Sequence, residues 1–113
     1  MKNEDKKLLM DILICLKHID DYIGPQKNFT MYQANFLLQD AVERNLITIG
    51  EAMSELLRRN PNVPITNARK IVDARNRLTH GYDEIENTQV WNIIINHLPI
   101  LSKEVTHLLK DKE

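Results

Sequence analysis

The chain has 113 residues, 42% of them hydrophobic and 27% charged, which is enough for one folded domain and too little for two of ordinary size. This length argues against a multidomain enzyme, and the single cysteine excludes an intramolecular disulfide framework. Fifteen basic and sixteen acidic residues leave a net charge of -1, so nucleic-acid binding would need a local basic surface. Aromatic residues, glycines and prolines are scarce, and this composition favours helix over a β-sandwich or disorder. We expect a single all-α domain over residues 1–113.

The N-terminal segment does not resemble a secretory signal. Its apolar run is broken by Asp11, and Glu4 and Asp5 stand among its lysines. Cys15 lies in an apolar stretch and is expected to be a small buried residue. No run approaches the length of a membrane span. These features predict a cytoplasmic protein without a membrane segment.

The first two helices are predicted over residues 4–23 and 30–59. Apolar residues at gaps of three and four define the first, and Gly24 and Pro25 end it. Thr30 and Gln33 match a capping box at the start of the second. The expected core positions of the second helix are Phe36 or Leu37, Ala41, Ile49, Ala52 and Leu56. Asp40, Glu43, Arg44 and Asn45 interrupt that stripe and must face water, a pocket or a second subunit.

Two further helices are predicted in the C-terminal half. One starts near Thr66 or Asn67 and ends at Gly81. The other starts near Asn87 or Thr88, and Pro99 should kink it. Its core stripe is Val90, Trp91, Ile94, Leu98, Leu101, Val105 and Leu108. We therefore expect an antiparallel bundle of four main helices, with one of them kinked or split.

Polar side chains cluster at the predicted end of the third helix, in the run Arg75-Asn76-Arg77-Leu78-Thr79-His80-Gly81-Tyr82. Arg75 and His80 are five residues apart, about 140° around an ideal helix, so a regular helix would not point them the same way. Gly81 would permit an unwound turn that brings His80 towards Arg75. Asn76 already shares a helix face with His80.

An arginine and a histidine that converge suit phosphodiester cleavage. The guanidinium can hold phosphate oxygens, and the imidazole moves a proton near neutral pH. On RNA the nucleophile would be the neighbouring ribose 2′-hydroxyl, so neither a metal nor a cofactor is expected. The residues alone leave a plainer interpretation open, in which Arg75 and Arg77 are solvated and the helix dipole stabilises His80. Residues 57–80 carry six basic residues and one acid, a local basic surface of the kind that RNA needs.

The motif resembles the Arg-x4-His-x-Tyr signature of HepT-like proteins in the HEPN superfamily. The resemblance extends to a run in the second helix and another in the fourth, so it covers nearly the whole chain. These runs are Glu43-Arg44-Asn45-Leu46 with Ile49-Gly50-Glu51-Ala52, and Val90-Trp91-Asn92-Ile93-Ile94 with Leu98-Pro99. The resemblance implies a HEPN-like helical fold and a dimeric, metal-independent endoribonuclease. It also implies that this enzyme is the toxin of a type VII-like toxin–antitoxin pair.

The resemblance also implies a role for each motif residue. Arg75 would bind the scissile phosphate, His80 would act as general acid or base, and Asn76 would orient the pair. Tyr82 would receive AMP from a minimal nucleotidyltransferase antitoxin, often called MntA, which neutralises the toxin. The alternative is a noncatalytic HEPN module that binds a nucleotide or docks a nucleotidyltransferase.

Further expectations concern the dimer and individual residues outside the motif. A two-fold axis near the end of the third helix would give a homodimer two motifs in one cleft, lined by residues 40–45. Glu51 would either position Arg75 or be a surface residue beside a close helix packing at Gly50. Trp91 is expected to be a core or interface anchor, and His18, His97 and His107 to be ordinary surface or partly buried residues.

Overall fold

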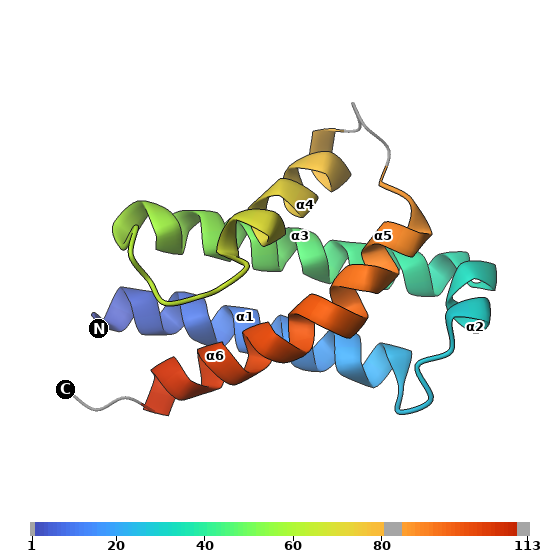
Figure 1. The fold of residues 1–113 in the computed structure, drawn as a ribbon, viewed down its shortest axis with the longest axis horizontal. Coiled ribbons are helices and arrows are strands. Elements are labelled where there is room, and N and C mark those ends of the chain that lie inside the picture. Colours follow the sequence, from blue (N-terminus) through green and yellow to red (C-terminus); the bar gives the residue numbers. More distant parts are fainter. Residues whose placement is uncertain (1, 81–84, 111–113) are drawn as a thin grey trace.

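The computed structural model describes residues 2–80 and 85–110, and all regular secondary structure among them is helical. The elements are α1 (Asn3–Ile23), α2 (Phe29–Ala34), α3 (Phe36–Arg59), α4 (Ala68–His80), α5 (Asn87–Asn92), the π-helical stretch η1 (Ile93–His97) and α6 (Leu98–Lys110). α1 and α3 run antiparallel, α5, η1 and α6 form one long rod across them, and α4 lies on α3 (Figure 1). The all-α bundle is confirmed. No described helix has the length and apolar character needed to cross a membrane.

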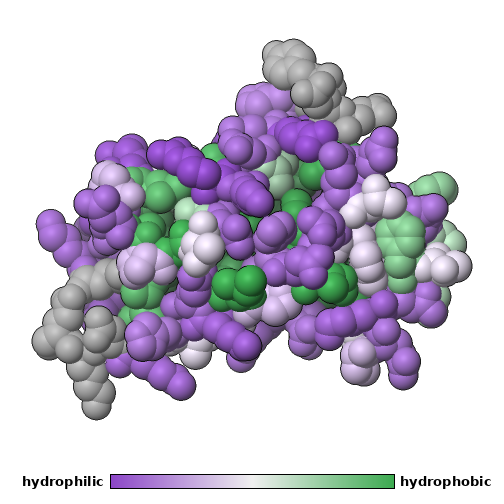
Figure 2. Space-filling model, viewed as in Figure 1, coloured by the Kyte–Doolittle hydropathy of each residue, from purple (hydrophilic) through white to green (hydrophobic). Residues whose placement is uncertain are grey.

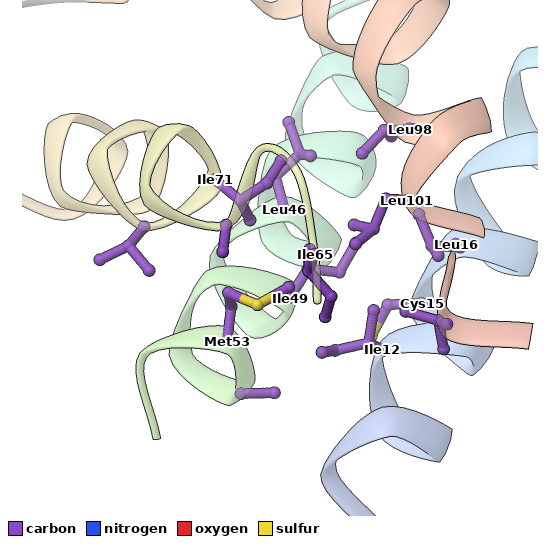
Figure 3. Close-up of a cluster of buried hydrophobic side chains, with 14 of the residues drawn as sticks. Ile12, Cys15, Leu16, Leu46, Ile49, Met53, Ile65, Ile71, Leu98 and Leu101 are labelled. Carbon is purple, nitrogen blue, oxygen red and sulfur yellow. The ribbon is translucent and has the colours of Figure 1, made fainter. Parts of the chain in front are cut away.

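The core is formed where α1, α3 and the long C-terminal rod meet (Figure 3). α1 contributes Ile12 and Leu16, α3 contributes Ile49 and Met53, and α6 contributes Leu101. The predicted stripe of the fourth helix is buried at every position except Trp91, which is half-buried. Burying branched aliphatic side chains at helical spacing provides most of the stabilisation of such a bundle.

Polar contacts fix the connections around the core. Arg59 at the end of α3 donates through Nε to Oδ1 of Asp5 on α1 at 2.8 Å, and its Nη2 lies 2.6 Å from Oε2 of Glu4. Thr66, just before α4, donates its backbone N–H and its hydroxyl to the carboxylate of Glu104 on α6. The start of α4 is thus tied to the opposite side of the bundle.

The second helix differs from its prediction, because it is split at Asn35. Asn28, not Thr30, caps α2 by accepting from the N–H of Met31. Asn35 adopts an extended backbone and caps α3 by accepting from the N–H of Leu38. The split leaves Phe36 and Leu37 78% and 80% exposed, so the prediction that one of them enters the core is wrong.

The fourth helix begins as predicted and is irregular just before Pro99. Glu86 and Gln89 form a capping box that starts α5. The rod then widens into η1, where the N–H of Leu98 bonds to the carbonyl of Ile93. Proline has no N–H to donate, so a regular α-helix through Pro99 would leave a carbonyl unpaired. The wider turn is the local irregularity that the proline predicts.

An aromatic cluster joins α5 to α2. Trp91 packs with its ring centroid 5.4 Å from that of Tyr32 and 5.5 Å from that of Phe29. Tyr32 is buried, its hydroxyl has no hydrogen-bond partner within the described residues, and burial raises the pKa of the phenol well above its usual value. Trp91 is therefore a core anchor, as expected.

Candidate active site

α4 crosses α3 at Gly50, and the crossing leaves room for no larger residue. A Cβ built on Gly50 would lie 2.2 Å from Cβ of Arg75 and 3.3 Å from the carbonyl oxygen of Ile71. Carbon atoms do not approach each other so closely, so a side chain here would push α4 away from α3. The glycine of α3 therefore sets the place from which the Arg75 side chain projects.

The guanidinium of Arg75 is held by two polar neighbours. Its Nη1 donates to Oδ1 of Asn76 at 2.7 Å, and its Nη2 lies 3.7 Å from Oε2 of Glu51 on α3. Its Nε is buried and has no hydrogen-bond partner in the described part of the chain. The two terminal nitrogens are thus the part of Arg75 that can reach a ligand, and an anion would approach end-on.

Glu51 satisfies both interpretations that the sequence left open. Its side chain is 55% exposed, and Gly50 beside it does mark a close helix packing. The same carboxylate nevertheless faces the guanidinium of Arg75. A partly exposed pair of this kind adds little stability.

The structure does not bring Arg75 and His80 together within one chain. The sequence predicts an unwound turn at Gly81 that would move His80, and α4 is helical up to His80, its last residue. The two side chains therefore leave the helix about 140° apart. Asn76 and His80 share a face, together with Asp73 and Arg77, at spacings of three and four. Gly81 and Tyr82 lie outside the described residues.

Only part of the predicted basic surface lies near the motif. Arg58 pairs with Glu55, and Arg59 pairs with Glu4 and Asp5 at the far end of α3. All three of these acids lie outside residues 57–80, so a charge count over that range omits them. The cations that stay beside the motif are those of α4, namely Arg69, Lys70, Arg75 and Arg77.

The polar stretch of residues 40–45 faces two ways. Asn45 donates to the carbonyl of Ala41 and accepts, through Oδ1, from Nδ1 of His18 on α1 at 3.1 Å. This part joins two helices of the bundle. Glu43 is half-buried, and burial together with the nearby charge of Asp40 raises the pKa of its carboxyl. Asp40 and Arg44 face solvent.

A groove runs between α4 and the long rod, next to the face that carries Asn76 and His80. It has a volume of about 500 Å³ and is lined in part by His97, a residue that no sequence motif singles out. Figure 2 shows hydrophobic side chains between the hydrophilic ones of α4 and α5. His97 belongs to η1, so only the π-helical turn and the packing of distant segments reveal its place.

The remaining candidates have structural surroundings. Cys15 is buried as expected, and burial raises the pKa of its thiol. His18 stacks on Tyr22 in addition to its contact with Asn45. Within residues 2–80 and 85–110, no group of three or more His, Cys, Asp or Glu side chains is arranged to hold a metal ion.

The helical bundle, with Arg75 and His80 five residues apart near the end of α4, agrees with the resemblance to HEPN-type proteins. The profile of the ribonuclease HepT-like family matches residues 12–108. The chain therefore belongs to the ribonuclease HepT-like family.

Relatives of this chain occur in Methanocaldococcus jannaschii. "Putative RNase MJ0127" is 32% identical over 99% of this chain and 93% of its own length. "Putative RNase MJ1216" is 29% identical over the same shares, and "Putative RNase MJ0125" is 28% identical over 99% of this chain and 97% of its own. No solved structure matches the chain.

Proposed function

We propose that this protein is a metal-independent endoribonuclease that acts in the cytoplasm as the toxin of a type VII-like toxin–antitoxin pair. The observation that carries the proposal is the fixed guanidinium of Arg75. It is positioned by the Gly50 crossing, bonded to Asn76 and compensated by Glu51. An arginine restrained in this way can bind a phosphate with little further loss of side-chain freedom. Family membership supports RNA as the substrate.

The proposed reaction is a transesterification within the RNA strand. The 2′-oxygen attacks the neighbouring phosphorus, the bond from phosphorus to the 5′-oxygen breaks, and a 2′,3′-cyclic phosphate and a 5′-hydroxyl end result. One group takes the proton of the 2′-hydroxyl and another gives a proton to the 5′-oxygen. Arg75 would neutralise charge on the phosphate. His80 would carry out one of the two proton transfers.

A homodimer would supply the second proton-transfer group. Arg75 and His80 diverge within one chain, so a site made from both protomers relieves the mismatch. The exposed face of α3 runs from Leu37 through Arg44 to Glu51, which contacts Arg75. Its apolar end, formed by Phe36 and Leu37, is the most exposed large hydrophobic surface in the described part of the chain. We propose that this face packs against a second copy and that residues 40–44 line the shared cleft.

Neutralisation would use Tyr82. Tyr82 stands two residues after His80 in the motif. Transfer of AMP from ATP to this oxygen by a minimal nucleotidyltransferase would add a phosphodiester charge and a bulky nucleoside, and both would oppose RNA binding.

The test is an RNA cleavage assay with chelator present. We expect Arg75→Ala and His80→Ala to lower the cleavage rate by about 10²- to 10⁴-fold. Arg58→Ala and His107→Ala are the matched controls, because both lie on other helices away from the motif, and they should cleave like the wild type. Wild-type protein that leaves RNA intact, or motif variants that cut at the wild-type rate, would favour the noncatalytic module.

Modification is tested by mass spectrometry. The partner and ATP should add adenylate to the wild type, and Tyr82→Phe should abolish this, with Tyr22→Phe as the control. Adenylate that persists on the Tyr82→Phe variant would place the target elsewhere.

A further inference from the structure

The groove between α4 and the long rod offers hydrogen-bond donors along both walls. Lys70 and Arg77 come from α4, and Gln89 and Asn92 come from α5. Oε1 of Gln89 already accepts from the N–H of Glu86 at 2.9 Å and from Arg77 at 3.4 Å. Oδ1 of Asn92 already accepts from the amide of Asn96 at 2.6 Å. Both amides are therefore oriented to present their NH2 groups as donors.

Among the described residues, Asp73 is the one acid that lines this groove. A donor-rich surface with two cations suits a ligand that carries a phosphate and carbonyl oxygens. A carboxylate among these donors suits a ligand that also has hydroxyl groups to donate. Ala74 and Ile93 add an apolar floor against which a flat ring can lie. A ribonucleotide has a phosphate, ribose hydroxyls and a base, and the groove volume of about 500 Å³ is in the range of small-ligand sites.

The groove is continuous with the proposed active face. Asp73 and Arg77, which line the groove, each lie three residues before a residue of that face, Asn76 and His80 respectively. A strand bound at Arg77 would therefore lie about one helical turn from His80.

We propose that this groove is a ribonucleotide subsite of the RNA substrate. Lys70 and Arg77 contact phosphate, the amides of Gln89 and Asn92 donate to base carbonyls, and Asp73 accepts from the ribose 2′-hydroxyl. This proposal rests on the proposed ribonuclease function. It adds a binding site and a reason for RNA to be preferred over DNA, because only RNA carries the 2′-hydroxyl.

Binding is measured with the non-cleaving His80→Ala protein, using a single-stranded RNA ten-mer and the DNA ten-mer of the same sequence. Lys70→Gln should weaken RNA binding by about fivefold or more, because it removes a phosphate contact. Lys103→Gln on α6 removes the same charge outside the groove and should change it by less than about twofold. Equal weakening by both variants would show general attraction and overturn the proposal.

Asp73→Asn separates recognition of ribose from the effect of charge. Removing the acid lowers repulsion of both oligonucleotides, so both should bind more tightly or equally. The ratio of RNA to DNA affinity should nevertheless fall towards one, and Asp21→Asn on α1 should leave that ratio unchanged. An unchanged ratio in Asp73→Asn would remove Asp73 from ribose recognition.

Amide chemical shifts in the full chain locate the ligand, with AMP and the RNA ten-mer as separate probes. Shifts with RNA should concentrate on residues 70–77 and 88–97. Chemical-shift changes in the groove with AMP but not with the RNA ten-mer would assign the groove to a free nucleotide and overturn the RNA subsite. Groove shifts with RNA in a wild type that cleaves nothing would refute the ribonuclease and keep the subsite. RNA cleavage by the Lys70→Gln variant with an unchanged KM would refute the subsite and keep the ribonuclease.

Discussion

Gly50 of α3 lies directly against Arg75 of α4, at a distance that allows no side chain between them. The position of the proposed catalytic arginine is therefore set by a residue that has no functional group. The same contact buries Nε of Arg75 and leaves its terminal nitrogens to Asn76, Glu51 and a ligand.

Gly50→Ala should destabilise the protein, although alanine is the better helix former by about 1 kcal/mol. The new Cβ would lie 2.2 Å from Cβ of Arg75, so α4 must shift. We expect the free energy of unfolding to fall by about 1 to 3 kcal/mol, measured by urea denaturation, and RNA cleavage to fall with it. Ser54→Ala, exposed on the next turn, should stay within about 0.5 kcal/mol. A more stable Gly50→Ala protein would contradict the close crossing.

Glu51→Gln should affect catalysis more than stability. The pair with Arg75 is exposed on the Glu51 side, so its loss should cost at most about 1 kcal/mol. Without the carboxylate the guanidinium can turn away, and we expect kcat for RNA cleavage to fall about tenfold with a smaller change in KM. Glu51→Asp should recover part of the loss. Glu55→Gln removes a carboxylate one turn away that pairs with Arg58, and kcat should not respond to it.

Three alanine variants distinguish the observed caps, Asn28 and Asn35, from the predicted cap, Thr30. Asn28→Ala and Asn35→Ala should each cost about 1 kcal/mol in thermal unfolding, because each side chain accepts a backbone N–H. Thr30→Ala should cost less than about 0.5 kcal/mol, since Thr30 lies inside α2. The reverse order would support one continuous helix from Thr30.

Leu37→Glu should convert the proposed homodimer to a monomer. Leu37 is 80% exposed, so the change costs the isolated chain little, whereas a charge on a packed interface is expensive. Light scattering would report the mass, and cleavage should fall by about 10²-fold if both protomers supply a proton-transfer group. Ile100→Glu changes an exposed residue of α6 and is the control, so this variant should remain dimeric. A wild type that is already monomeric at working concentrations would refute the dimer.

Glu43→Gln should stabilise the fold at neutral pH. Burial and the charge of Asp40 raise the pKa of Glu43 above its ordinary 4.5, so the folded protein binds this proton more tightly than the unfolded chain. Stability from this group is complete below about pH 4.5 and is lost as the pH rises through the raised value. The variant should therefore melt at a higher temperature than the wild type at pH 7, and the difference should vanish near pH 4. A constant difference would point to packing instead.

Periodic features of the fold could be predicted from the sequence. The stripe of α5 and α6, the end of α1 at Gly24 and the start of α5 follow from residue spacing and turn chemistry, which are local. The split at Asn35 could not be, because Thr30 with Gln33 offers an equally good cap and neither Gly nor Pro marks the break. Once Asn35 caps α3, the helix phase turns Phe36 and Leu37 outward.

The candidate site was predictable to the extent that it lies on one helix. Asn76 and His80 share a face because of their spacing, which the sequence states directly. The contacts of Arg75 with Gly50 and Glu51 depend on how two helices cross, and no local pattern encodes that crossing. The same holds for His97, which lines the groove only because of where the rod and α4 lie on the bundle.

The π-helical turn of η1 sets how the side chains of α5 are rotated about the rod axis relative to those of α6. A π turn is equivalent to one residue inserted in an α-helix, a rotation of about 100° between the segments on either side. On one side Trp91 faces the aromatic cluster and Asn92 faces the groove, and on the other Leu101 and Val105 face the core. Removing one residue from 93–97 would restore a uniform helix and force the rod to give up one of these alignments. The length of this segment therefore determines whether both alignments can be kept.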